Sequence, residues 1–199
     1  MKQRDDMKKK AFKLILIIVL FVPLAARGQA YVGGGYITST NSDSHDVKGV
    51  EVVIQSKYQI KDSRFAIMPS VNMGLLYEYV NKEYLESYTT TLSIAANGSF
   101  DIIQSKWVIF SLFAGPVMRW EHTFEPGSES TFNEYEARAN KSHEWGYELG
   151  VTLDVRISDK ISTRLIPFAV QRTLKEQSSL LHQTSYLTLM IGINNTKKN

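Results

Sequence analysis

Apolar and polar residues alternate over the stretch 65–79 of this chain. Apolar side chains occupy every odd position from Phe65 to Tyr79, and the even positions are smaller or more polar, among them Ser70 and Asn72. A period of two indicates a β-strand whose two faces meet different surroundings. The stretch is much longer than the roughly five to six residues of an ordinary strand, and such a length is typical of a strand that crosses a membrane.

Seven further segments show the same period and complete a set of eight predicted strands: 31–40, 47–60, 65–80, 88–103, 107–124, 143–157, 161–174 and 184–194. No stretch shows a clear helical period. The seventh segment is ambiguous, because Arg164 and Arg172 share one face with Ile166, Phe168 and Val170, and we predict a bulge there.

The predicted connections alternate in length. Short links follow the second, fourth and sixth segments, at 61–64, 104–106 and 158–160, whereas the other links are longer and 125–142 is the longest. Short turns at one end and long loops at the other are typical of a transmembrane β-barrel with both termini on the short-turn side. We therefore predict an all-β fold, an eight-stranded antiparallel up-and-down transmembrane barrel.

Rings are sorted to the two ends of the apolar faces, which favours the membrane barrel over a soluble one with its apolar face inside. Aliphatic residues fill the middle, as expected for a hydrocarbon layer between two aromatic girdles. We predict the following girdle: Tyr77, Tyr79, Tyr88, Trp120, Phe124, Trp145 and Tyr147 at the long-loop end, and Phe65, Phe100 and Phe110 at the short-turn end.

The opposite faces carry acids and bases in near balance, and in a narrow barrel these must pair or contact water. The predicted lumen network consists of Arg119, Glu121, Glu144, Glu148, Asp154, Arg156 and Arg164, with Glu51, Glu78, Asp101, Lys57 and Arg172 on the same faces. An eight-stranded barrel has an interior that side chains fill, so a general diffusion pore is not expected, and neither is a cofactor.

A leader precedes the first strand. Lysines at 8–10 and 13 come before an apolar run at 14–22, and small residues close the segment, as in a secretory signal peptide. The run is too short for a transmembrane helix, which needs about twenty residues. We predict a signal peptide at 1–30, cleavage between Ala30 and Tyr31, and a barrel domain at 31–199.

Charge and cysteine content narrow the function classes. Residues 1–30 hold seven of the 23 Lys and Arg and two of the 20 Asp and Glu, so the remaining chain is formally −2 and no nucleic-acid partner is expected. The absence of cysteine excludes disulfides and thiolate metal sites.

In this layout of strands and loops, residues 31–199 resemble the small eight-stranded outer-membrane proteins of the OmpX and OmpA-transmembrane-domain type. The resemblance implies a location in the cell outer membrane, contact with membrane lipid and lipopolysaccharide, and a structural or surface-interaction role. The 125–142 loop is then a candidate contact for an extracellular partner.

Two alternatives remain. Some barrels of this size are lipid A-modifying acyltransferases or deacylases, and His122 and His143 lie near Ser142 and Ser87 in the predicted layout. A Ser-His pair needs an orienting carboxylate, for which Glu121 or Glu144 are candidates, although both are predicted to point inward. The other alternative is a soluble periplasmic ligand-binding barrel.

Overall fold

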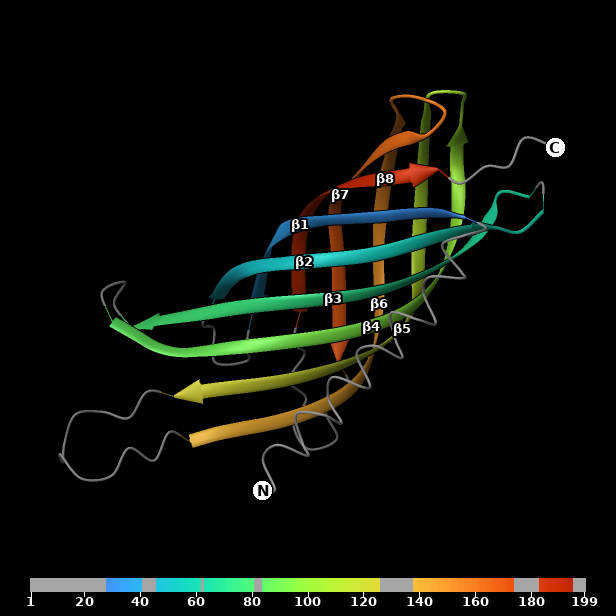
Figure 1. The fold of residues 1–199 in the computed structure, drawn as a ribbon. Coiled ribbons are helices and arrows are strands. Elements are labelled where there is room, and N and C mark those ends of the chain that lie inside the picture. Colours follow the sequence, from blue (N-terminus) through green and yellow to red (C-terminus); the bar gives the residue numbers. More distant parts are fainter. Residues whose placement is uncertain are drawn as a thin grey trace, which may run out of the picture.

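Eight antiparallel strands form one closed barrel (Figure 1). The computed structural model describes residues 28–40, 46–61, 63–80, 84–125, 138–173 and 183–194. The strands are β1 (Gln29–Thr40), β2 (Asp46–Gln59), β3 (Phe65–Val80), β4 (Tyr84–Gln104), β5 (Val108–Glu125), β6 (Arg138–Arg156), β7 (Ile161–Thr173) and β8 (Gln183–Asn194). Each strand pairs with the next along the chain, and β1 also pairs with β8. The predicted fold class, an up-and-down barrel of eight antiparallel strands, is confirmed.

Within the described ranges, no helix is long and apolar enough to span a membrane.

One half of the barrel is taller than the other. Strands β3 to β6 contain 16, 21, 18 and 19 residues, whereas β1, β2, β7 and β8 contain 12 to 14. The extra length projects at the end where the long links lie (Figure 1). The predicted starts of β4 and β6, at 88 and 143, are too late because the first residues of these strands lose the apolar alternation.

A register shift re-aims the second half of β7. The pairing with β8 shifts between Ile166 and Val170, and the pairing with β6 shifts between Val151 and Leu153. The predicted bulge is therefore present. It corrects the predicted face of Arg172, which pairs with the outward-facing Tyr147, whereas Arg164 before the bulge is buried inside.

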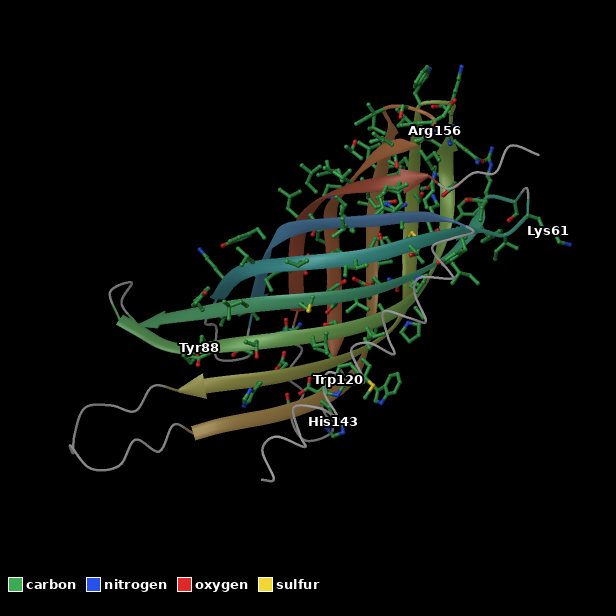
Figure 2. All side chains as sticks on the ribbon, in the orientation of Figure 1. Lys61, Tyr88, Trp120, His143 and Arg156 are labelled. Atoms are coloured by element: carbon green, nitrogen blue, oxygen red, sulfur yellow. The ribbon has the colours of Figure 1, made fainter. Side chains whose placement is uncertain are left out.

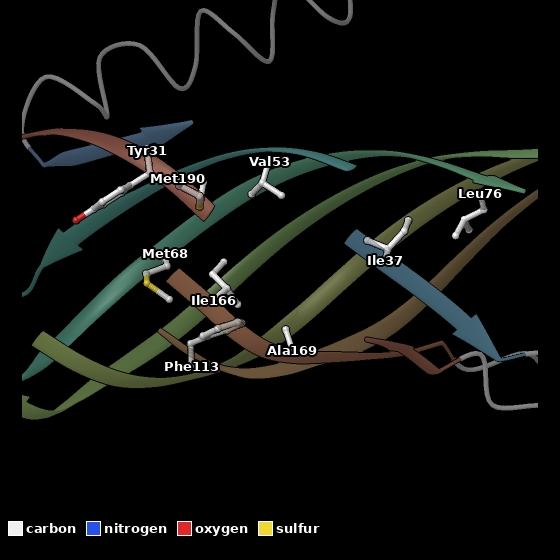
Figure 3. Packing of buried hydrophobic residues seen from close by; sticks show 9 residues of the cluster. All are labelled: Tyr31, Ile37, Val53, Met68, Leu76, Phe113, Ile166, Ala169 and Met190. Atoms are coloured by element: carbon white, nitrogen blue, oxygen red, sulfur yellow. The ribbon is translucent and has the colours of Figure 1, made fainter. Parts of the chain in front are cut away.

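The lumen contains an apolar cluster as well as charges (Figure 3). Tyr31 and Phe113 are the two rings in it, and Met68, Ile166 and Met190 pack with them. Two glycines leave the space that these rings occupy, because a Cβ at Gly192 would meet the Tyr31 ring and one at Gly150 the Phe113 ring. The interior is thus filled by side chains rather than open.

Replacement of Gly192 by valine tests this packing. The added side chain collides with Tyr31, and overpacking of a filled interior costs about 1–3 kcal/mol. We expect Gly192→Val to lower the free energy of unfolding by this amount, measured by urea titration in detergent micelles. The matched control is Gly98→Val, because a Cβ at the exposed Gly98 has only ordinary contacts. Equal stability of the two variants would contradict the packing described.

Candidate functional site: the filled lumen and the outer wall

The outer wall of the barrel is apolar along its strands. Leu189 is 61% exposed and Trp145 is 60% exposed, and further aliphatic residues of every strand point outward. The alternate positions face the lumen and are buried, and many of them are polar or charged. This arrangement is the reverse of a soluble barrel, in which the apolar face is inside.

An ion-pair cluster fills the lumen near the short-turn end. Arg164 is fully buried and donates from Nε and Nη2 to the two carboxylate oxygens of Asp154, at 2.5 and 2.7 Å. Lys57 Nζ lies 2.7 Å from Asp101 Oδ1 and 3.7 Å from Asp154 Oδ2. Ser111 donates to the same Asp101 oxygen at 2.7 Å. Two bases and two acids are therefore linked across the barrel.

Neutral groups make the remaining contacts of the Arg164 guanidinium. Its Nη1 donates to Gln55 Oε1 at 2.7 Å, and its guanidinium carbon lies 3.8 Å from the centroid of the Tyr31 ring. The Tyr31 hydroxyl donates to Gln29 Oε1 at 2.8 Å. A buried guanidinium is tolerated only when its donors are satisfied, and here carboxylate, amide and ring surround it.

Smaller polar groups bridge the lumen further toward the long-loop end. Asn97 Nδ2 and Gln171 Nε2 donate to the two carboxylate oxygens of Glu148, at 2.5 and 3.3 Å. Thr188 donates to Glu51 at 2.6 Å. Arg119 Nε lies 2.8 Å from Glu121. Two of these contacts join strands that are not direct neighbours, β4 to β6 through Asn97 and Glu148 and β8 to β2 through Thr188 and Glu51.

Small hollows lie between the described side chains, and two of them share no lining residue. One lies at the short-turn mouth beside Tyr31, Asp154 and Arg156. The other lies beside Glu51, Asn72 and Arg119. Members of the ion-pair cluster and of the apolar cluster line these hollows, Asp154 and Tyr31 the first and Ile37 the second.

The structure places the seven predicted lumen residues as follows. Five are buried: Arg119, Glu144, Glu148, Asp154 and Arg164. Glu121 is partly exposed, and Arg156 is half-buried at the short-turn mouth. Within this set, Asp154 forms an ion pair with Arg164, and Arg119 forms one with Glu121. Lys57 and Asp101 join the first of these pairs to the rest of the lumen.

The predicted lumen network consisted of charged residues and left out the neutral members of the lumen. Gln55, Asn97 and Ser111 carry no charge signal, and Tyr31 stands out in the sequence only as a neighbour of the predicted cleavage site. Their common property is inward position in the strand alternation, opposite the exposed apolar residues. That position is the signal that could have identified them.

The predicted girdle residues occupy both ends of the outer wall. Trp145, Tyr147, Phe65 and Phe100 are exposed, and Phe65 and Phe100 have ring centroids 5.0 Å apart. Tyr77, Tyr88, Trp120 and Phe110 are half-buried on the same outward positions, and Tyr77 pairs with Tyr88. Tyr79 and Phe124 lie in β3 and β5, but their side chains are outside the described part. Among the residues described, three exposed rings lie outside the predicted girdle: Tyr36, Phe168, and Trp107 with Lys106 Nζ 5.2 Å from its ring centroid.

The histidines and serines considered for catalysis lie on opposite faces of the wall. His143 pairs with Trp120 on the outer face (Figure 2). His122 is the next outward residue of β5 after Trp120. Ser142 pairs with Glu121 on inward positions, and Ser87 is buried. The arrangement assembles no Ser-His-carboxylate triad from these residues. Among the described residues, no three His, Cys, Asp or Glu side chains cluster as a metal site.

Two predicted segments fall largely outside the described residues: 1–27 of the leader and 126–137 of the longest loop. Ala30 and Tyr31, which flank the predicted cleavage site, both lie in β1, where Ala30 pairs with Ser56 and with Ile193. Cleavage after Ala30 would leave a strand that starts at Tyr31.

The ion-pair cluster makes a testable contribution to stability. Asp154→Ala leaves Arg164 buried without its carboxylate, and we expect the free energy of unfolding to fall by about 3–5 kcal/mol. The double variant Asp154→Leu with Arg164→Met removes both charges and is expected to recover much of the loss. Urea titration in micelles measures both, with Asp159→Ala as the control because that carboxylate is exposed in the turn between β6 and β7. A double variant as unstable as Asp154→Ala would contradict the pairing.

Comparisons with known proteins agree on the architecture. No protein-family model matches the chain, and no curated protein matches it in sequence. Among solved structures, Neisserial surface protein A superposes with a TM-score of 0.55 at 13% identity, covering 84% of this chain and 96% of that protein. A major outer membrane protein from Thermus thermophilus superposes with a TM-score of 0.58 at 8% identity, covering 83% and 98%. The chain therefore has the fold of the small eight-stranded outer-membrane β-barrels.

Proposed function

We propose that this chain is an outer-membrane β-barrel protein that acts at the cell surface in a structural or interaction role. The observation that carries the proposal is the apolar outer wall combined with a lumen sealed by ion pairs and packed side chains. In a hydrocarbon layer every backbone polar group must be bonded within the protein, and the closed ladder from β1 to β8 meets this requirement.

The orientation of the barrel follows from its connections. In outer-membrane barrels the short turns face the periplasm and the longer loops face the outside. The turns after β2, β4 and β6 thus lie on the periplasmic side, and the tall half of the barrel projects outward. The segment 1–30 is the proposed export signal, and loop 125–142 is the proposed contact for an extracellular partner.

The filled lumen favours an interaction role over transport. The ion-pair cluster crosses the barrel from Lys57 on β2 to Asp101, Asp154 and Arg164 on β4, β6 and β7. A solute would have to displace these charges from one another. Because the lumen is filled, a partner can reach only the loops, the projecting strands and the outer wall.

A charge on the outer wall distinguishes the membrane barrel from a soluble one. We expect Leu189→Arg to cost about 2–4 kcal/mol near the middle of the membrane and to reduce the folded protein in the outer-membrane fraction. The amount of folded protein is measured from the band that changes mobility on heating in SDS gels. The matched control, Ile157→Arg, places the same side chain in the exposed segment between β6 and β7 and is expected to have little effect. A Leu189→Arg protein that is fully folded and stable would contradict the membrane placement.

Conductance tests the sealed lumen. Purified protein inserted into planar lipid bilayers is expected to show no stable open-pore current, with a large general porin in the same bilayers as the positive control. A steady current from the wild-type barrel would refute the closed interior.

A further inference from the structure

The two faces of the described barrel wall differ in their charges, because the lumen face carries both acids and bases whereas the outer face carries no described carboxylate. Among strand residues with described side chains, the carboxylates all occupy inward positions: Glu51, Asp101, Glu121, Glu144, Glu148 and Asp154. The charged or imidazole side chains at outward positions of these strands are Lys48, His122, His143 and Arg172. All four lie in the long-loop half of their strands. The described outer wall therefore offers hydrogen-bond donors and positive charge, without carboxylates, at the level of the outer leaflet.

Three of these four residues gather on β5, β6 and β7. His143 pairs with Trp120 on β5, and His122 is two residues beyond Trp120. Arg172 pairs with Tyr147 on β6. His143 and Tyr147 are four residues apart on one strand, which is about 13 Å at 3.3 Å per residue. The patch thus has a histidine end and an arginine end.

Aromatic side chains separate the two ends of the patch. Trp145 and Tyr147 lie on the outward positions of β6 after His143, and both are exposed, at 60% and 43%. Exposed Trp and Tyr at this depth have apolar ring faces and polar edges, which suit the headgroup region. The flat faces also suit stacking against a sugar ring.

The donors at both ends match phosphate oxygens. Imidazole N–H groups donate hydrogen bonds, and a guanidinium binds phosphate through two parallel donors. The Nε atom of Arg172 is buried, and no acceptor for it is found among the described residues. An anionic group beside Arg172 would accept hydrogen bonds from the guanidinium N–H groups of this side chain.

We propose that the patch formed by His122, His143, Trp145, Tyr147 and Arg172 binds the lipid A part of lipopolysaccharide. Lipid A is a disaccharide with a phosphate at each end, and its two phosphates match the histidine end and the arginine end, with the sugars over Trp145 and Tyr147. A phospholipid has one phosphate and engages one end only. The inference rests on the proposed outer-membrane placement, which puts this patch in the outer leaflet.

Native mass spectrometry of the full protein in micelles tests the patch. The probes are diphosphoryl lipid A, monophosphoryl lipid A and phosphatidylglycerol. We expect one diphosphoryl lipid A to bind with the highest affinity, and the loss of one phosphate to weaken binding about tenfold, as for one charge-assisted contact. Equal affinity for phosphatidylglycerol would overturn the proposal in favour of general attraction to anionic lipid.

Substitutions locate the two ends. Arg172→Gln, and the double variant His122→Gln with His143→Gln, are each expected to weaken diphosphoryl lipid A binding about tenfold. Lys48→Gln is the matched control, because it removes a base from the outer wall on β2, on the other side of the barrel. Wild-type affinity in both patch variants would overturn the assignment.

Heat-modifiable mobility in SDS gels confirms that each variant is folded. If wild-type protein is found in the outer membrane but does not prefer lipid A, the lipid inference fails while the proposed function stands. If the protein is absent from the outer membrane, the proposed function fails as well.

Discussion

Closure of the sheet is the constraint on which the rest of this structure depends. Strand β1 pairs with both β2 and β8 along its whole length, so the barrel has no lateral edge between its first and last strands. Closure with only eight strands makes the interior narrow. Every inward side chain must then fit among its neighbours, and every inward charge must find a counter-charge or a hydrogen bond.

The lumen meets this demand with two kinds of packing. Near the short-turn end, Arg164 and Lys57 share the carboxylates of Asp154 and Asp101. Next to this cluster, Phe113, Met68 and Met190 fill the interior without charge. Buried ion pairs of this kind contribute less to net stability than their contacts suggest, but loss of one partner is costly. They therefore specify which residues must coexist inside the barrel.

The residues that bear on the proposed function lie on the outer wall rather than in the lumen. Its aliphatic band suits hydrocarbon, and its rings lie at both ends. The same alternation that sends carboxylates inward leaves basic and imidazole groups outside in the long-loop half. The two-residue period of the strands thus places the carboxylates of the interior and the apolar and basic groups of the outer wall on opposite faces.

The sequence alone determined the number of strands, their alternation and the unequal links, because a period of two records which residues face hydrocarbon and which face the lumen. It also placed Asp154 and Arg164 on inward positions. It could not determine the partners of these residues, since Lys57 and Asp101 approach them only when distant strands curve around one lumen. The face predicted for Arg172 was wrong, because a one-residue shift in β7 reverses every later side chain. The stretch 65–79, which lies in β3, has two different faces in the sequence, and closure of the sheet decided which of them encloses the lumen.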